Sequence, residues 1–267
     1  MVARVRCDPA RRLTRPGTAN PPPTKSRDHH SEDDIAMPTT KPSSADRKAP
    51  ASRRTASKEV RRQQLIDATI NSIAKHGIAG TTMSTVTEFA GLSIGIVNFH
   101  FQSKQNLLEE TLMYLAREHH DHWMKSYRDA GLGAPEKLLA IVDAHFHPRI
   151  CTRKKLAVWY AFYGEAGRRA RYRDLADQID DERLGVSKAL CAEIIGEGDH
   201  TGPPAQQIAY TLEGLYDGIC LNILMYPEHF SRPQAKAQIR AYLASVFPRH
   251  IAMPIFDSEG ASKTGID

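Results

Sequence analysis

Residues 81–108 read TTMSTVTEFAGLSIGIVNFHFQSKQNLL. Thr82 is a good N-cap for a helix over Met83 to Ala90, because its hydroxyl can accept a hydrogen bond from a free backbone N–H of the first turn. Gly91 follows directly, and glycine tolerates the left-handed backbone that ends a helix in a tight turn. The stretch therefore predicts a short helix that stops at a glycine turn.

Two further helices flank this one. Ser93 is a suitable N-cap for a short helix that runs from Ile94 to about Phe99. Upstream, apolar residues recur at helical spacing from Lys58 onwards, and a basic last turn followed by Gly77 predicts where this first helix ends. The sequence thus predicts three helices in succession, the last two short and joined at a glycine.

This arrangement is typical of a helix-turn-helix, which places one helix in the major groove of DNA. Val86 and Phe89 are expected to face inward and to hold the second helix against its neighbours. The exposed start of the third helix, Ser93 to Asn98, can then reach base edges and phosphates. The N-termini of both short helices also present free backbone N–H groups to phosphate. The pattern therefore indicates DNA binding.

The same residues closely resemble the DNA-binding domain of the TetR family of regulators. The likeness rests on Thr81-Thr82-Met83, Val86, Ala90-Gly91-Leu92-Ser93, Gly95, His100-Phe101, Ser103-Lys104 and Leu107-Leu108. The resemblance implies an all-helical homodimer, a transcriptional repressor that binds operator DNA and carries a C-terminal domain for a small-molecule ligand. Two positions depart from the family: Asn98 stands where a tyrosine is common, and Thr87 where the family usually has a small alanine.

The resemblance also assigns roles by position. Phosphate contacts fall on Thr82, His100 and Lys104. The base-reading segment comprises Ser93, Ile94, Gly95, Ile96 and Asn98, and Phe99 adjoins it. Asn98 can bond either adenine or a phosphate, so its role stays open. For Phe99 the alternative is packing in the core, and for Lys104 it is a solvated surface lysine.

The remainder of the chain also reads as helices. They are expected at residues 104–127, 135–146, 156–166, 174–195, 205–226 and 234–247. No stretch alternates β-branched and polar residues over the length of a strand. The expected fold class is therefore all-α, with a helix-turn-helix domain at residues 58–104 and a helical ligand-binding and dimerisation domain at 105–253.

Two short motifs in the second half look like the choline-responsive BetI branch of the family. They are Val158-Trp159-Tyr160-Ala161-Phe162-Tyr163 and Leu215-Tyr216-Asp217-Gly218-Ile219. Trp159, Phe162 and Tyr163 share one helix face. Such a face beside a carboxylate, Glu165 or Asp143, can hold a quaternary ammonium inducer of the choline or betaine class by cation–π attraction. The alternative is that these aromatic side chains are core.

The last two expected helices present apolar residues at helical spacing. These are Ile208, Leu212, Leu215, Ile219, Ile239, Leu243 and Val246. Two such helices from each subunit are expected to form a four-helix interface in a homodimer. Packing within a single chain is the alternative.

A histidine-rich helix favours a different function. His119, His120 and His122 lie beside Glu118 and Asp121. Metal ligation by these residues would make the chain a metal-binding helical enzyme or a metal-responsive sensor. The sequence lacks His-Glu-x-x-His, a phosphate-binding loop and a nucleophile elbow. We therefore expect no enzyme and no metal, and a solvated histidine face.

Composition limits the other possibilities. Of 267 residues, 41% are hydrophobic and 25% charged, which is ordinary for a soluble globular protein. No run of about 18 apolar residues predicts a membrane span, and the four scattered cysteines predict free thiols in a reducing cytoplasm. Residues 1–57 are basic and Pro-rich and are expected to be disordered, with Met37 as an alternative start. Residues 254–267 are expected to be a second disordered tail.

Overall fold

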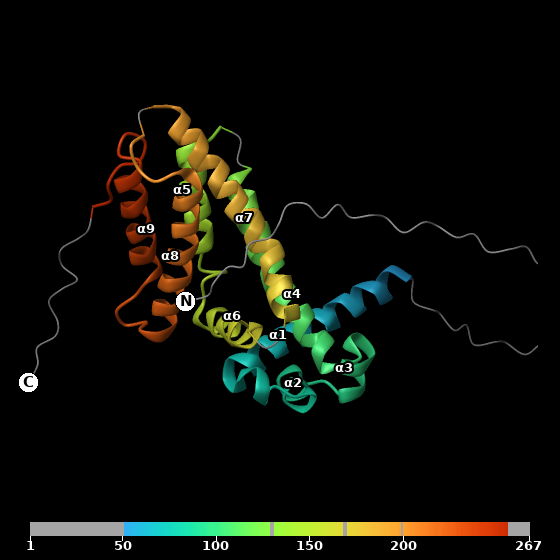
Figure 1. The fold of residues 1–267 in the computed structure, drawn as a ribbon. Helices are drawn as coiled ribbons and strands as arrows, with labels where there is room; N and C mark the ends of the chain where they lie inside the picture. Colours follow the sequence, from blue (N-terminus) through green and yellow to red (C-terminus); the bar gives the residue numbers. More distant parts are fainter. Residues whose placement is uncertain (1–50, 129–130, 168–169, 199, 256–267) are drawn as a thin grey trace, which may run out of the picture. The chain divides into compact units, whose positions relative to one another are not determined.

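The structure, a computed structural model, describes residues 51–128, 131–167, 170–198 and 200–255. Its helices in chain order are α1 (Ala51–Gly80), α2 (Met83–Ala90), α3 (Ile94–Phe101), α4 (Lys104–Tyr127), α5 (Ala134–His145), α6 (Arg153–Ala166), α7 (Ala170–Gly196), α8 (Ala205–Met225) and α9 (Arg232–Val246). No strand occurs within the described ranges, so the all-α prediction is confirmed (Figure 1).

The predicted helices are all present, with ends shifted by a few residues. The largest correction concerns the first helix, because α1 begins at Ala51 and not at Lys58. Its helical backbone breaks at Gly77, where φ is 68° and ψ is 177°, as the glycine predicted. The prediction of disordered tails lies outside the described residues for positions 1–50 and 256–267.

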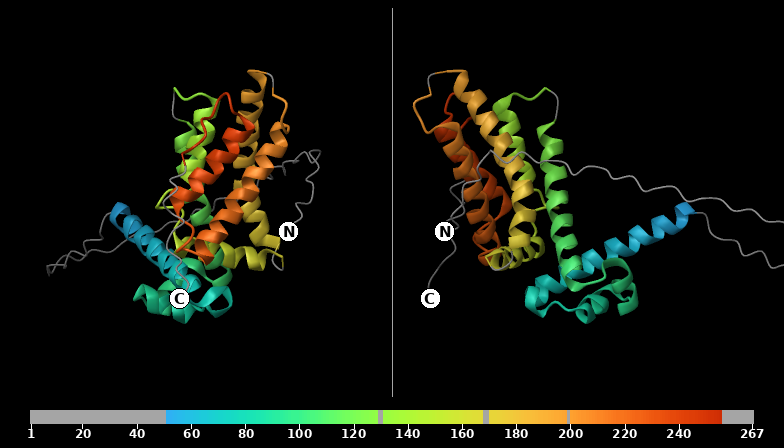
Figure 2. Two further views of the ribbon diagram at one scale, coloured as in Figure 1. Left: turned by 90° about the vertical axis from the view of Figure 1, so that its left-hand side faces the viewer. Right: turned by 45° about the vertical axis from the view of Figure 1, so that its right-hand side comes forward.

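A hydrophobic cluster joins the helix-turn-helix to the helices that follow it. Helix α1 packs against α2, α4 and α6, and Figure 2 shows α2 and α3 beside the end of α1 and the start of α4. Buried members of this cluster include Leu65, Ile73, Val86, Val97, Phe101, Leu108, Val158 and Phe162. Because Val158 and Phe162 belong to α6, this helix shares a core with α1, α2 and α3.

A second hydrophobic cluster fills the C-terminal part of the chain. It is formed by α5, α7, α8 and α9 together with the end of α4, where Trp123 is fully buried. Helix α4 therefore contributes its first half to one cluster and its last turns to the other. None of the described helices combines the length and the apolar character that crossing a membrane requires.

Five of the seven residues predicted to form a dimer interface are covered within their own chain, while Leu215 and Val246 are partly buried. Ile208, Leu212, Ile219, Ile239 and Leu243 are buried inside their own chain, in the C-terminal cluster. Amphipathic spacing marks the face that a helix buries, but it does not say whether the partner is the same chain or a second copy. The exposed large apolar side chains of α8 are instead Tyr210, Leu221 and Met225.

Candidate DNA-binding surface and ligand cavity

Both ends of α2 have the predicted geometry. The Thr82 hydroxyl accepts a hydrogen bond from the Thr85 backbone N–H at 3.1 Å, and the Thr85 hydroxyl accepts one from the Thr82 N–H at 2.9 Å. These two bonds form a capping box. Gly91 has φ 62° and ψ 33°, a left-handed conformation that favours glycine. Ser93 occupies the N-cap position of α3, but its side chain makes no capping hydrogen bond.

Helix α3 presents most of its surface to solvent. Ile94 is 51% exposed, Ile96 37% and Phe99 69%, and Gly95 and Asn98 are exposed as well. Val97 and Phe101 are buried on the opposite side and fix the helix on the domain core. The predicted base-reading residues therefore share the exposed side of α3, and the core alternative for Phe99 is wrong.

Phe89 corrects the prediction that two residues of α2 face inward. Val86 is fully buried, whereas Phe89 is 39% exposed. Val86 and Ala90 are four residues apart and point to the same side of the helix, so Phe89 is rotated away from the core. The Lys75 ammonium lies 5.7 Å from the centre of the Phe89 ring.

The three predicted phosphate contacts differ in their surroundings. Thr82 is exposed at the N-terminus of α2. The Lys104 ammonium donates a hydrogen bond to the Ile78 carbonyl at 3.2 Å, so this lysine is tied to the end of α1 rather than simply solvated. Burial, followed by the charges of Lys58 and Arg62, lowers the pKa of His100. Its Nδ1 atom is buried and finds no hydrogen-bond partner within the described part of the chain.

Basic side chains of α1 accompany the aromatic residues of α3. The Lys58 ammonium lies 5.8 Å from the centre of the Phe99 ring, and the Arg62 guanidinium 5.0 Å from that of Phe101. Positive charge beside an exposed helix is the arrangement that attracts a phosphate backbone. The geometry of α1 to α3 therefore suits a nucleic-acid duplex.

A cavity of about 60 Å³ lies in the C-terminal part of the chain. Its wall contains aromatic, histidine, cysteine and charged side chains from α4 to α8. The lining residues are His119, His145, Ile150, Cys151, Leu156, Trp159, Tyr160, Tyr163, Arg183, Tyr216, Asp217 and Cys220. A buried water needs about 10–15 Å³ measured in this way, so the volume suits about four to six water molecules or a ligand of similar size.

Two of the three predicted ligand residues line this cavity. Trp159 and Tyr163 do so, and the centres of their rings are 5.9 Å apart. Tyr160 also lines the cavity, and the centre of its ring is 5.9 Å from that of Tyr163. Phe162 does not line the cavity. It is buried in the core with α1 and meets the Tyr172 ring edge-on at 5.1 Å.

The carboxylate of the cavity wall is also a different one from those expected. The Asp143 carboxylate forms ion pairs with Arg240 at 2.6 Å and with Lys236 at 3.3 Å. Neither Asp143 nor Glu165 lines the cavity. Asp217 of α8 lines it instead. The Tyr160 hydroxyl donates to the Asp217 backbone carbonyl at 2.6 Å, which joins α6 to α8 at this point.

One side of the cavity is a buried polar network. Arg183 forms a two-pronged ion pair with Glu213, and their side chains are only 5% and 4% exposed. Arg183 Nη1 also lies 3.4 Å from Nδ1 of His119, and Nε2 of His119 lies 3.1 Å from Nδ1 of His145. Burial first, and then nearby positive groups, hold the pKa values of both histidines well below 6.5, so the two rings are neutral at pH 7.

Tyr216 has an unusual position in this wall. Its ring stacks on His145 with centres 4.3 Å apart, and it is 1% exposed. Its hydroxyl is buried and has no hydrogen-bond partner among the described residues. An unsatisfied buried hydroxyl costs about 1–3 kcal/mol, so a ligand group that bonds to it recovers part of that free energy.

The histidines of α4 have separate surroundings. No group of three or more histidine, cysteine, aspartate or glutamate side chains in the described ranges is arranged to hold a metal ion. The prediction of a solvated face is wrong for His119, which is 7% exposed and lines the cavity. His120 contacts Glu182 at 3.0 Å, and the His122 ring lies 4.2 Å from that of His147.

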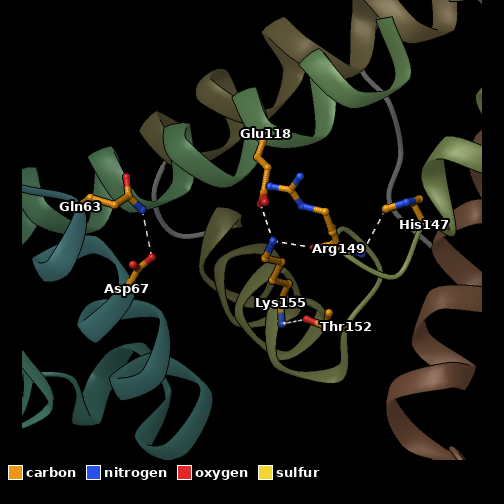
Figure 3. A network of polar contacts seen from close by, with 7 residues as sticks. All are labelled: Gln63, Asp67, Glu118, His147, Arg149, Thr152 and Lys155. Atoms are coloured by element: carbon orange, nitrogen blue, oxygen red, sulfur yellow. Dashed lines mark hydrogen bonds and ion pairs between the residues drawn. The ribbon is translucent and has the colours of Figure 1, made fainter. Parts of the chain in front are cut away.

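A group of polar contacts joins α4 to the start of α6. Figure 3 shows the Lys155 ammonium of α6 between the Glu118 carboxylate of α4, at 2.5 Å, and the Arg149 backbone carbonyl, at 2.6 Å. The Lys155 backbone N–H also donates to the Thr152 hydroxyl, the N-cap of α6. These bonds fix the start of α6 against α4.

Sequence reasoning missed most of the cavity wall. Arg183 belonged to no motif, and His119 and His145 are far in sequence from the residues that they contact. The signal available for α8 was Tyr216-Asp217, which the second motif contained without a stated role.

Known proteins resemble the chain over both parts. Residues 65–111 match the description "Bacterial regulatory proteins, tetR family", and residues 134–248 match "BetI-type transcriptional repressor, C-terminal". A similar protein, HTH-type transcriptional regulator BetI of Paraburkholderia xenovorans (strain LB400), is 31% identical over 186 residues, which cover 70% of this chain and 93% of that protein. BetI of Burkholderia thailandensis is 35% identical over 169 residues, covering 61% and 82% respectively.

Solved structures have the same fold. A candidate transcriptional regulator from Pseudomonas aeruginosa PAO1 superimposes with a TM-score of 0.64 and 24% identity, over 72% of this chain and 92% of that chain. A candidate regulator from Saccharomonospora viridis, crystallised in complex with choline, has a TM-score of 0.62 and 19% identity, over 69% and 96%.

Proposed function

The chain belongs to the TetR family of transcriptional regulators and has a BetI-type C-terminal domain, and we propose that it is a repressor that a small quaternary ammonium compound releases from its operator. The observation that supports the ligand class most directly is the cavity, in which three aromatic rings of α6 and the Asp217 carboxylate of α8 share one wall.

The charge balance of the cavity favours a cation. Arg183 and Glu213 neutralise each other, and the two buried histidines are neutral at pH 7. Asp217 contributes a carboxylate to the lining itself. A cation over the faces of Trp159 and Tyr163 gains up to about 2 kcal/mol for each desolvated contact.

The size and the polar wall narrow the ligand further. A volume of about 60 Å³ suits a molecule of a few heavy atoms and excludes a long acyl chain. The Tyr216 hydroxyl offers a hydrogen bond to the hydroxyl of choline or to the carboxylate of a betaine. The choline complex of the structurally similar Saccharomonospora protein agrees with this class, although likeness at 19% identity carries only the fold.

Helix α6 provides the connection to DNA binding. Trp159 and Tyr163 line the cavity on one face, while Val158 and Phe162 are buried in the core shared with α1 on the other. A ligand that shifts α6 must therefore move side chains packed against the first DNA-binding helix. Such a ligand changes DNA affinity only if it binds one placement of these helices more tightly than another.

The DNA-binding form is a homodimer on a palindromic site. The exposed apolar side chains Tyr210, Leu221 and Met225 lie on α8, and Gly214 and Gly218 leave room on the same helix for close approach of a second copy. A twofold dimer presents two α3 helices to two half-sites. We place this regulator in the cytoplasm, where its operator is.

Titration calorimetry tests the ligand class. Choline and glycine betaine are titrated into the full-length protein beside the carbon analogue of choline, in which a quaternary carbon replaces nitrogen. We expect micromolar to millimolar dissociation constants for at least one cation and weaker binding of the carbon analogue, because two cation–π contacts supply up to about 4 kcal/mol.

Variants locate the site. Tyr163→Leu should weaken binding by roughly tenfold or more, while Phe89→Leu removes an aromatic ring outside the cavity and should leave binding unchanged. Equal binding of the carbon analogue would remove the cation–π argument, and absence of binding by every compound would overturn the ligand class. Gel shifts on a palindrome selected from random duplexes, with and without the bound compound, test release.

A further inference from the structure

The cavity wall holds two thiols that the proposed ligand does not require. Cys151 lies directly before the N-cap of α6, and Cys220 lies on α8. Both are buried and line the same cavity of about 60 Å³, which brings the two thiols to one small space. From these contacts we propose that Cys151 and Cys220 are a modification site at which a hydroperoxide entering the cavity forms a disulfide bond.

The direction of the hydrogen bonds around the pair follows from Arg183. A guanidinium can only donate, so Nη1 of Arg183 makes Nδ1 of His119 an acceptor. Neutral His119 then carries its proton on Nε2 and donates it to Nδ1 of His145. The same argument leaves His145 with a proton on Nε2, which lies 3.5 Å from the Cys220 sulfur. Cys220 therefore accepts from His145, and its own S–H is available to Cys151, the other thiol of the cavity wall.

The pKa values of the two thiols are shifted in opposite directions. The hydrogen bond from Cys220, assisted by the charge of Arg232, lowers the pKa of Cys151 against the opposing effect of burial. The Arg232 guanidinium also donates to the Cys151 backbone carbonyl at 3.4 Å, which holds the charge nearby. The interaction with Cys151 and then burial raise the pKa of Cys220. Thiolate is the reactive form, so Cys151 is the nucleophile and Cys220 the resolving thiol.

The reaction balances with a hydroperoxide as oxidant. The Cys151 thiolate attacks the outer peroxide oxygen, the O–O bond breaks, and the alkoxide leaves and takes up a proton as an alcohol, or as water from hydrogen peroxide. The Cys220 sulfur then attacks the sulfenic acid sulfur of Cys151, an S–S bond forms, and hydroxide leaves as water with the Cys220 proton. Two thiols are oxidised by two electrons and the peroxide is reduced by two.

Cys191 provides a matched control within the same molecule. It is fully buried, does not line the cavity, and burial raises its pKa to about 12. A thiol of this kind is inert. If Cys151 is oxidised and Cys191 is not, the difference is therefore due to the surroundings of Cys151 in the cavity and not to general oxidation of the protein.

The test oxidises the full-length Cys7→Ser protein with hydrogen peroxide and maps its thiols by alkylation and peptide mass spectrometry. A disulfide between Cys151 and Cys220 that a dithiol reverses is expected, and Cys191→Ser should give the same result. Cys220→Ser should stop at a sulfenic acid on Cys151, trapped by dimedone, and Cys151→Ser should accumulate at least about tenfold less of it. Circular dichroism melts confirm that each variant is folded.

Three outcomes would overturn the inference: thiols that stay alkylatable after oxidation, a disulfide that includes Cys191, or equal sulfenic acid in the two serine variants. The link to regulation rests on the proposed function, and it is tested separately. Choline that occupies the cavity should slow disulfide formation about tenfold. A disulfide that forms at the same rate with choline would overturn the proposed ligand and leave the thiol site supported. Choline that binds while no disulfide forms would overturn the thiol site and leave the proposed ligand supported.

Discussion

Helix α3 presents Ile94, Ile96 and Phe99 to solvent, whereas the cavity wall holds His119, Arg183 and Tyr216 inside the chain. The proposed DNA-binding surface comes from consecutive residues on one short helix. The cavity comes from five helices and one connection, and its polar groups depend on each other for hydrogen bonds. Substitutions on α3 should therefore change binding without changing stability, while substitutions in the cavity wall should change both.

The buried ion pair should give the largest effect. Glu213→Ala leaves the Arg183 charge buried without its partner and should lower the free energy of unfolding by about 3–5 kcal/mol in urea denaturation. Glu110→Ala is the control, because it breaks the partly exposed pair with Arg62, and such pairs contribute about 0–1 kcal/mol.

A double variant separates burial from pairing. Replacing both partners, as Arg183→Met with Glu213→Leu, should recover much of the loss, since no charge then remains buried. A loss at Glu213→Ala no greater than that at Glu110→Ala would mean that the cavity wall is far more solvated than its exposure indicates.

Asn98 tests the other side of the comparison. Asn98→Ala should leave the melting temperature unchanged and should alter the preferred sequence in binding to randomised duplexes, by about 1–3 kcal/mol at one base pair of each half-site. Lys104→Ala should instead weaken all sequences about equally and reduce the salt dependence. Equal weakening of every sequence by Asn98→Ala would assign this residue to a phosphate.

The two buried histidines predict a pH-dependent stability. Their pKa values in the folded protein lie well below 6.5, so the unfolded chain binds more protons than the folded one as the pH falls below 6.5. Unfolding free energy is therefore greatest above pH 6.5 and decreases below it, by up to about 1.4 kcal/mol per pH unit for each histidine. His145→Gln keeps donor and acceptor groups and should reduce this slope by one proton, measured by urea titrations between pH 5 and pH 8. His229→Gln changes an exposed histidine, and a similar reduction there would contradict the assignment.

The sequence alone was sufficient to predict the features that depend on residues close together in the chain. Thr82, Gly91 and the ends of α2 followed from capping and turn chemistry, which act within a few residues. The same local reasoning found Trp159 and Tyr163 on one face of α6. It assigned Phe162 to that face too, because helical spacing does not separate a cavity wall from a core contact with α1.

The rest required tertiary contacts. The ion pair of Arg183 with Glu213 joins residues 30 positions apart, and His119 meets His145 across 26. No spacing rule connects such residues, since their approach depends on how α4, α5, α7 and α8 pack. The apolar face of α8 was found correctly as a pattern, but the pattern could not tell a core shared with its own chain from an interface with a second copy.

Phe99 should give the smallest change in stability, and for that reason it is the sharpest test of the surface described for α3. Its side chain is 69% exposed and touches the Lys58 ammonium rather than the domain core. Phe99→Ser should therefore change the free energy of unfolding by no more than about 0.5 kcal/mol, while it weakens DNA binding through the loss of apolar contact with the duplex. Phe101→Ser is the matched variant two positions away. This ring is 3% exposed in the shared core, so its removal should cost about 3–5 kcal/mol, as large aromatic truncations do. Urea denaturation and gel shifts on both variants give four values. A large loss of stability at Phe99 would show that this ring is covered in solution and would return it to the core.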